Sequence, residues 1–252
     1  MVLNIKSKTR PSKSPGPVVA LGDLVADFIV AGSPLPIGPG QHQEVQDIYL
    51  EPGGGANFLI AGARLDYPMK ALGLLGEDVW GQQVAAAIQA EGVDLSGVQY
   101  NGTTTRVVVL ISPTGEHVFL GKLGHSSMVR LRPADEESIK SAGAIYCAGY
   151  TLNEQGLVDM VLEAMHLARQ AGVPVFFDPG PQIVITPAKL RQEVLPLIDT
   201  LLTTEGEISL FSHHGLADLM KHGPGTIVVK RGAAGCVVSL ISSSRSTRSG
   251  AR

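Results

Sequence analysis

The 252-residue sequence is poor in cysteine, in long apolar runs and in nucleotide-binding fingerprints. Its two cysteines, Cys147 and Cys236, form no CxxC pair and lie in apolar, strand-like contexts, which predicts reduced, buried thiols in a cytoplasmic protein. No run approaches the roughly 18 apolar residues of a membrane helix, so we expect no membrane partner. The sequence has no GxGxxG run and no P-loop, since the spacing from Gly76 to Gly81 is followed by glutamines, and a dinucleotide-binding oxidoreductase therefore has little support.

Charge is distributed unevenly along the chain. The formal net charge is −3, but residues 1–17 and 242–252 carry basic residues and no acidic ones, which leaves 13 basic and 23 acidic residues in the body. A nucleic-acid site needs a basic face on the folded part, so we expect no nucleic-acid partner. Residues 1–17 lack the apolar stretch of a secretory signal and contain three prolines, which predicts a disordered basic tail.

Apolar runs with β-branched residues alternate with helical stretches along most of the chain. This alternation is typical of parallel strands joined by right-handed crossovers, and so of an α/β fold. The expected strands are 18–30, 69–75, 144–148, 174–177, 200–203 and 226–229, and the expected helices are 57–65, 79–91, 154–171 and 205–211.

Local signals define two of these regions further. Thr151 and Glu154 have the spacing of a capping box, and Gly172 is placed to end the helix that they would begin. An antiparallel hairpin is predicted for 106–121, because β-branched runs flank the turn sequence Pro-Thr-Gly-Glu. With residues 44–50, this hairpin could form a small separate sheet.

Three successive glycines, within Pro52 to Asn57, are the most informative feature of the chain. The apolar residues that follow have roughly helical spacing, which places the glycines at a helix N-terminus. Backbone without side chains lets a ligand approach the unpaired N–H groups at that end. An isolated triple glycine more often forms a tight loop, and it is the surrounding residues that favour a ligand site here.

The surrounding motifs resemble, in their order, those of the ribokinase-like (PfkB) family of carbohydrate and nucleoside kinases. The resemblance covers roughly residues 18–241 and rests on the ordered set rather than on any single motif. It implies a doubly wound, mostly parallel α/β sheet with a small β lid, here truncated at the C-terminus. The matching segments are Val18 to Asp27, Leu35 to Gly40, Pro52 to Asn57, Gly73 to Gly81, Glu91 to Asp94, Arg106 to Leu120, Asp178 to Pro181, Glu205 to Glu207 and Lys230 to Gly235.

The resemblance assigns the acceptor sugar, or a related small molecule, to one group of residues. It implies substrate binding by Asp27, Gly53, Gly54 and Asn57. An ionised carboxylate can accept from two adjacent sugar hydroxyls, which suits Asp27 to that role. Asp27 could instead be a solvated residue at a strand end, and Asn57 could be a helix N-cap.

The resemblance assigns ATP and Mg²⁺ to a second group. It implies cofactor binding by Thr204, Lys230, Gly232 and Gly235, and an organising role for Glu207 at the metal. Thr204 stands where the family has Asn and Lys230 where it has Thr, which puts the metal and nucleotide arrangement in doubt. Glu207 could instead complement a helix dipole, and the two glycines could simply form a hairpin turn. Asp178 could face the same cleft or begin a turn.

The family's second signature, a Gly-Ala-Gly-Asp turn that supplies the catalytic base, does not occur in this sequence. We therefore expect a basic tail (1–17), an incomplete kinase-like domain (18–241) with lid strands near 35–51 and 104–121, and a non-native-looking Ser/Arg tail (242–252). The expected function is ATP-dependent phosphorylation of a sugar hydroxyl, with negligible activity in this polypeptide. A non-catalytic sugar-binding protein and a pure scaffold are alternatives, and the lid strands could form a homodimer.

Overall fold

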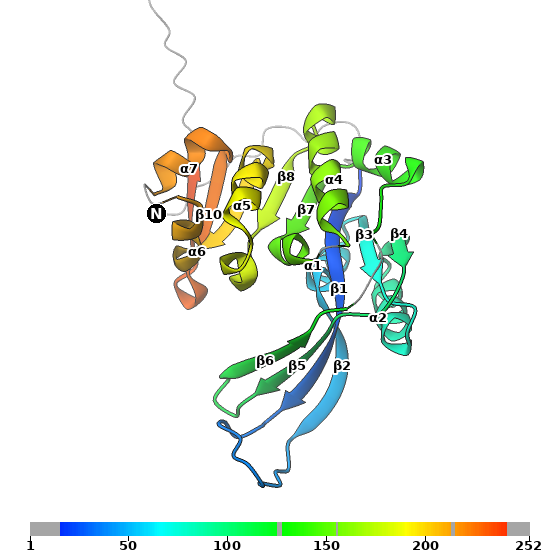
Figure 1. The fold of residues 1–252 in the computed structure, drawn as a ribbon, viewed down its shortest axis with the longest axis vertical. Coiled ribbons are helices and arrows are strands. Elements are labelled where there is room, and N and C mark those ends of the chain that lie inside the picture. The colour runs from blue at the N-terminus through cyan, green and yellow to red at the C-terminus, as the bar shows by residue number, and fades with distance from the viewer. Residues whose placement is uncertain (1–15, 125–127, 155, 213–214, 241–252) are drawn as a thin grey trace, which may run out of the picture.

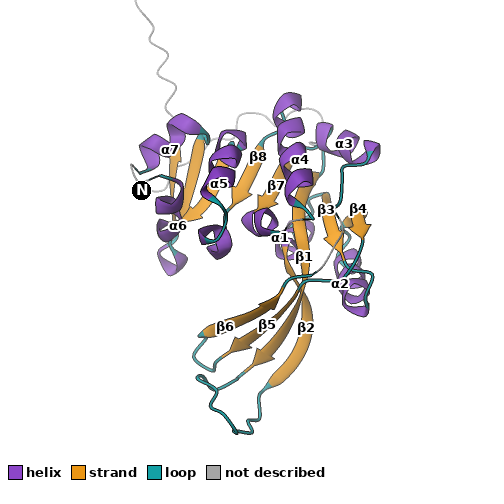
Figure 2. Cartoon of the chain, viewed as in Figure 1, coloured by secondary structure: helices purple, strands orange, loops and turns teal. Residues whose placement is uncertain are grey.

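The computed structural model describes residues 16–124, 128–154, 156–212 and 215–240. These residues form alternating strands and helices (Figures 1 and 2). The strands are β1 (Val18–Ala31), β2 (Asp47–Gly54), β3 (Met69–Leu75), β4 (Asp94–Tyr100), β5 (Arg106–Ile111), β6 (His117–Lys122), β7 (Ala144–Ala148), β8 (Val175–Asp178), β9 (Thr200–Thr204), β10 (Thr226–Lys230) and β11 (Cys236–Leu240). The helices are α1 (Gly55–Arg64), α2 (Val79–Ala90), α3 (Pro133–Lys140), α4 (Val158–Ala171), α5 (Ala188–Val194), α6 (Glu205–Phe211) and α7 (Leu216–His222).

The main sheet has the strand order β11-β10-β9-β8-β7-β1-β3-β4. Its strands pair in parallel except for β10 and β11, which are antiparallel. This confirms the predicted mostly parallel sheet. In such a sheet, ligands gather beyond the carboxyl ends of the strands, so those ends are where a site is sought.

A second, smaller sheet projects from the main body at the carboxyl end of β1 (Figure 1). It has the order β2-β1-β5-β6, and we call it the lid sheet. Strand β1 belongs to both sheets, because Val18 to Asp23 pair with β3 and Leu24 to Ala31 pair with β2. The lid sheet is therefore a continuous extension of the main sheet's central strand.

Apolar clusters lie on both faces of the main sheet. Val19 and Leu21 of β1 belong to a cluster that includes residues of α4, α5 and α7. Ala20 and Leu24 belong to a second cluster, which includes residues of α1 and α2. Because alternate residues of a strand point to opposite faces, helices cover both faces, as a doubly wound fold requires.

Three expectations need correction or fall outside the structure. Helix α4 begins at Val158, because the Thr151 hydroxyl donates to the Ala148 carbonyl oxygen at 2.7 Å instead of capping a helix. Cys147 is buried, but Cys236 is exposed since β11 is an edge strand. The predicted tails lie outside the described residues, except for the last two residues of 1–17.

Candidate functional site

The Asp27 side chain lies directly against the backbone of Gly53. Strands β1 and β2 pair with Asp27 opposite Glu51 and Val25 opposite Gly53, so Asp27 and Gly53 are diagonal neighbours on one face. A Cβ atom on Gly53 would overlap all three heavy atoms of the Asp27 carboxylate. Only glycine leaves room for that carboxylate here, and the two residues that the sequence singled out are brought together.

Helix α1 begins next to this pair. Gly54 is its N-cap, with a φ of 61° that favours glycine, and Gly55 is its first residue. Asn57 lies exposed in the first turn, so it is not the N-cap that one interpretation of the sequence proposed. The ring of Phe58 stacks on Tyr146 of β7 at 3.8 Å between centroids, which fixes the start of the helix against the main sheet. The unpaired N–H groups of α1 therefore open beside Asp27.

The environment of Asp27 shifts its ionisation. Burial, and then the negative charge of Glu51 across the strand pair, raise the pKa of Asp27 from 3.8 to about 6. No described residue forms a hydrogen bond or an ion pair with this carboxylate. At neutral pH Asp27 is mostly ionised, and its acceptor oxygens are available to a ligand that carries hydroxyl groups.

A second group of residues meets at the carboxyl ends of β8, β9 and β10. Lys230 and Thr204 are paired at the last position of β10 and β9. The Lys230 ammonium donates to the Asp178 carboxylate of β8 at 2.6 Å, and so reaches across the end of β9. The Gly180 N–H also donates to Oδ1 of Asp178 at 3.3 Å, so this side chain both begins the turn after β8 and pairs with Lys230 at this edge.

Glu207 is buried at the start of α6. Its Oε2 accepts from the Thr204 backbone N–H at 2.8 Å and from the Thr203 hydroxyl at 3.3 Å. This is the reciprocal half of a capping box, so Glu207 has a local structural role. Among the described residues, no three His, Cys, Asp or Glu side chains gather to hold a metal ion. The proposed role of Glu207 at a metal ion therefore stays a prediction.

Gly232 and Gly235 form the turn between β10 and β11. Both have positive φ values, and the Arg231 N–H donates to the Gly235 carbonyl oxygen at 2.8 Å. Arg231 also pairs with Glu205 of α6 at 2.7 Å, which ties this turn to the end of β9. The hairpin interpretation thus describes the local structure, and the turn lies beside Thr204 and Lys230.

Tyr150 is a candidate site residue that no sequence motif revealed. It follows β7, which neighbours both β1 and β8 in the sheet. Burial raises the pKa of its phenol, and the charges of Asp178, Glu207 and Asp27 raise it further. The negative charges of carboxylates from both groups of residues therefore act on the Tyr150 phenol. The only sequence signal was its position just after the strand 144–148.

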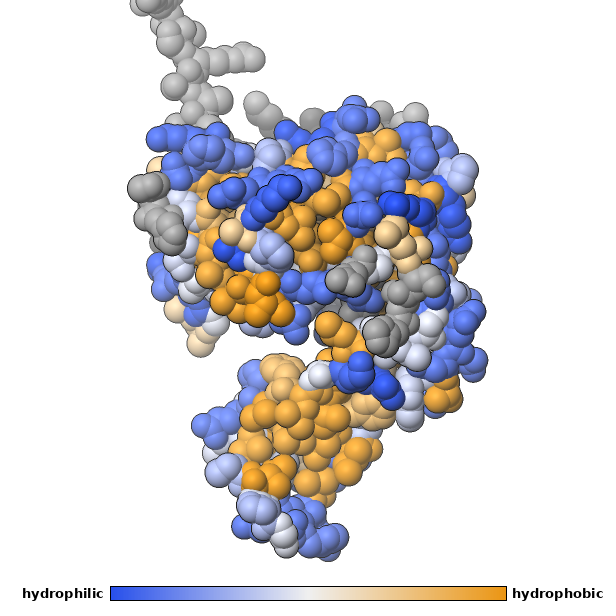
Figure 3. Space-filling view, viewed as in Figure 1, coloured by the Kyte–Doolittle hydropathy of each residue, from blue (hydrophilic) through white to orange (hydrophobic). Residues whose placement is uncertain are grey.

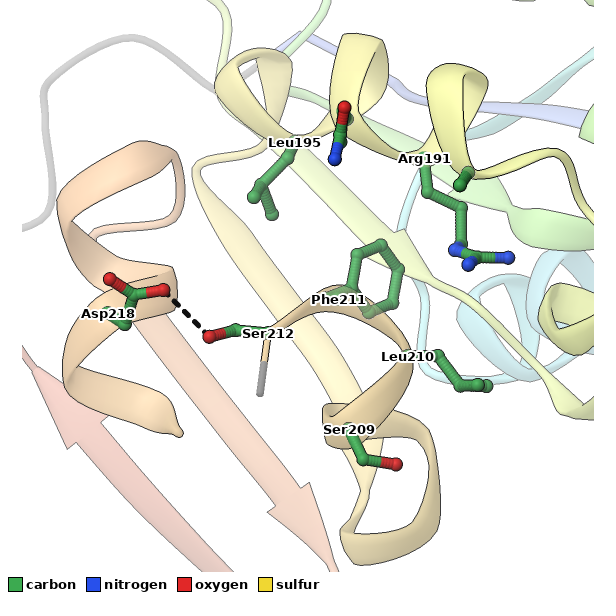
Figure 4. Close-up of a pocket in the computed structure, with 9 residues that line it drawn as sticks. Arg191, Leu195, Ser209, Leu210, Phe211, Ser212 and Asp218 are labelled. Atoms are coloured by element: carbon green, nitrogen blue, oxygen red, sulfur yellow. Dashed lines mark hydrogen bonds between the residues drawn. The ribbon is translucent and has the colours of Figure 1, made fainter. Parts of the chain in front are cut away.

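The described surface also has hollows. Figure 3 shows a deep notch between the lid sheet and the main body, on the side of the carboxyl ends of the strands. A separate cavity of about 270 Å³ lies between α5 and α6 (Figure 4). Arg191, Leu195 and Phe211 line it, and the Ser212 hydroxyl donates to Asp218 at 2.7 Å at its margin. None of the predicted site residues lines this cavity.

Comparison with known proteins identifies the class to which this fold and site belong. The model of the pfkB family of carbohydrate kinases matches residues 17–248. The chain therefore belongs to the pfkB carbohydrate kinase family, as its motifs predicted. None of the helices in the described part of the chain has both the length and the apolar character of a membrane span.

Particular relatives are fructokinases and ribokinases. The chain is 30% identical to fructokinase-1 of Oryza sativa subsp. japonica over 191 residues, which cover 72% of this chain and 57% of the relative. Fructokinase-1 of Zea mays gives the same identity and coverage over 192 residues. The chain thus spans just over half the length of these relatives.

Solved structures confirm the ribokinase-like fold. The Arabidopsis thaliana ribokinase complexed with ribose and ATP is 26% identical, with a TM-score of 0.72, and the match covers 90% of this chain and 76% of the ribokinase. The Halothermothrix orenii fructokinase has a TM-score of 0.73 at 20% identity, with 88% and 82% covered. The second likeness concerns the fold alone.

Proposed function

We propose that this chain binds a sugar, or a related hydroxylated molecule, against Asp27, Gly53, Gly54 and Asn57. The observation that carries the proposal is the contact of the Asp27 carboxylate with the bare Gly53 backbone, beside the N-terminus of α1. An acceptor-only carboxylate and donor-only N–H groups together match a hydroxyl, which both donates and accepts. Relatives named as fructokinases and a ribokinase bound to ribose support a sugar as the ligand.

We propose further that ATP binds at Thr204, Lys230, Gly232 and Gly235. A ribokinase solved with ATP supports the nucleotide, and Lys230 offers a point charge for phosphate. Magnesium usually keeps several waters and binds through phosphates and one or two carboxylates. Glu207, whose Oε2 already accepts from the Thr204 N–H, would order one of the waters of such an ion. When bound, Mg²⁺ would neutralise charge on the transferring phosphate.

Phosphoryl transfer to the sugar is the reaction of the class, but this 252-residue sequence contains no Gly-Ala-Gly-Asp run. Loss of a general base lowers rates by about 10² to 10⁴, and loss of amide donors for the developing charge by a similar factor. We therefore propose that this polypeptide alone transfers phosphate only at background rates. A coupled ATP-consumption assay with D-fructose and D-ribose tests this, and turnover well above background would contradict it.

The same missing run favours a second candidate, a sugar-binding protein without catalysis. Calorimetry separates the two candidates, because the second predicts sugar binding with no measurable ATP binding. Sugar binding that strengthens when ATP is present would favour the kinase instead. A pure scaffold would bind neither ligand, and its melting temperature would not change with either one.

We propose that the lid sheet forms the contact surface of a homodimer. The face opposite Asp27 carries an unbroken apolar row of Ile48, Val30, Leu110 and Val118 across all four strands. Ile48 is 65% exposed, and Leu120 in the neighbouring row is 57% exposed. Exposed apolar surface of this kind favours association. We expect light scattering to show a dimer, and we expect Leu120→Glu to dissociate it. Leu65→Glu is the control and should leave the dimer intact, because Leu65 lies exposed at the C-terminal end of α1.

A further inference from the structure

Tyr150 stands between the two proposed binding regions. It lies in the short 3₁₀ helix Gly149–Asn153, which directly follows β7. In the main sheet β7 lies between β8, which ends at Asp178, and β1, which carries Asp27. Tyr150 is therefore at the carboxyl edge of the sheet, where the sugar and the nucleotide would meet.

The ring of Tyr150 is held in place by close packing against glycine. A Cβ atom on Gly180 would lie 3.0 Å from Cε2 of Tyr150 and 3.5 Å from its hydroxyl oxygen. Gly180 has a φ of 62°, so both its conformation and this contact favour the absence of a side chain. Tyr150 is 36% exposed as a whole residue, which leaves part of it accessible to a ligand.

The Tyr150 hydroxyl forms no hydrogen bond with any described residue. Burial and the charges of Asp178, Glu207 and Asp27 raise the pKa of this phenol, so it stays protonated at neutral pH. The 3₁₀ helix that carries Tyr150 contacts β1, the strand that carries Asp27. Asp178 and Glu207 already accept bonds from Lys230 and from the Thr204 N–H. A protonated phenol is thus an unused donor in a region rich in acceptors.

We propose that Tyr150 is a specificity-determining residue for the sugar. Its phenol donates a hydrogen bond to one sugar hydroxyl, and that same hydroxyl donates to the Asp27 carboxylate. This inference rests on the proposed function, because it needs a sugar at Asp27. A hydroxyl can satisfy both partners, since it accepts from the phenol and donates to the carboxylate. A deoxy position can satisfy neither, and a carbonyl oxygen cannot donate to Asp27. Tyr150 therefore selects sugars with a hydroxyl at that position.

The test is titration calorimetry on the full chain at pH 8.0, with D-fructose and D-ribose as the probes. The variants are Tyr150→Phe, which keeps the ring on Gly180 and removes only the hydroxyl, and Asp27→Asn. Tyr100→Phe is the matched control, because Tyr100 is 46% exposed at the end of β4. Thermal melting checks that Tyr150→Phe folds like the wild type, as the absence of a described partner for its hydroxyl predicts.

We expect Tyr150→Phe to weaken binding of the sugar about three- to tenfold, as the loss of one neutral hydrogen bond would, and Tyr100→Phe to leave it unchanged. Among monodeoxy analogues of that sugar, the one that lacks the shared hydroxyl should bind wild type and Tyr150→Phe equally. Unchanged affinity in Tyr150→Phe, with loss in Asp27→Asn, would overturn this inference and leave the proposed function standing. Wild type that binds neither probe, or Asp27→Asn that binds as wild type does, would overturn both.

Discussion

Replacing Asp27 by Asn should make the protein more stable and at the same time less able to bind sugar. The folded state holds the Asp27 proton more tightly than the unfolded chain does, because burial and Glu51 raise its pKa from 3.8 to about 6. Ionising this carboxyl in the folded protein therefore costs free energy at neutral pH. Asparagine has a similar shape and no charge to bury.

The size of the effect follows from the pKa difference between the two states. One pKa unit corresponds to about 1.36 kcal/mol, which sets a ceiling of about 3 kcal/mol for Asp27. Since the side chain is only partly buried, solvent screening reduces this to about 1 to 2 kcal/mol. The cost is complete above pH 6, shrinks as the pH falls towards 3.8, and vanishes below that value.

Urea denaturation of wild type and Asp27→Asn at pH 8.0 and pH 4.5 measures this cost. The fluorescence of Trp80, the single tryptophan, reports on this region because its ring lies 4.9 Å from Phe28 of β1. We expect Asp27→Asn to be more stable by about 1 to 2 kcal/mol at pH 8.0, and by less than half of that at pH 4.5. Glu77→Gln, on an exposed loop residue, is the control and should show no such dependence.

Sugar affinity should change in the opposite direction. A hydrogen bond to a charged group contributes about 1.5 to 3 kcal/mol, so Asp27→Asn should weaken binding by about 10- to 150-fold. A variant that gains stability and loses binding is expected where a site stores an unfavourable charge. The reasoning would be refuted if Asp27→Asn were no more stable than wild type at pH 8.0, or if its advantage did not shrink in acid.

Further predictions concern backbone, capping and thiols. Gly53→Ala should cost about 1 to 3 kcal/mol of stability in urea denaturation, because the new Cβ would overlap the Asp27 carboxylate. Gly206→Ala is the control and should be neutral or stabilising, because open space surrounds Gly206. Equal effects of the two substitutions would contradict the contact between Gly53 and Asp27. Glu207→Ala should cost about 0.5 to 2 kcal/mol through the lost cap, and no loss would argue against the capping box. Iodoacetamide at pH 8 should label the exposed Cys236 but not Cys147, because burial raises the pKa of the Cys147 thiol to about 12. Mass spectrometry of the labelled native protein measures this, and labelling of both thiols would contradict the burial of Cys147.

Much of the fold could be predicted from local sequence. The strands 69–75 and 144–148 and the helix 205–211 have the predicted bounds, because short apolar runs and helical spacing are local signals. Strand β4 was missed, since Asp94–Tyr100 is short of apolar residues and contains Gly97. The division of β1 between two sheets could not be read either, because its 14 residues form one uninterrupted strand.

The site was predictable only in part. The ordered motifs pointed to Asp27 and Gly53, but their contact depends on the register of β1 and β2, which the sequence does not encode locally. The pairing of Lys230 with Asp178 depends on the order of β8, β9 and β10 in the sheet. Tyr150 carries no motif, and only the three-dimensional fold brings it near the carboxylates.

A crystal structure of the protein soaked with D-ribose or D-fructose would test the sugar site most directly. The account predicts sugar oxygens within hydrogen-bonding distance of the Asp27 carboxylate and the Asn57 amide, with the sugar seated over Gly53 and Gly54. Sugar bound elsewhere, with Asp27 facing only solvent, would contradict it.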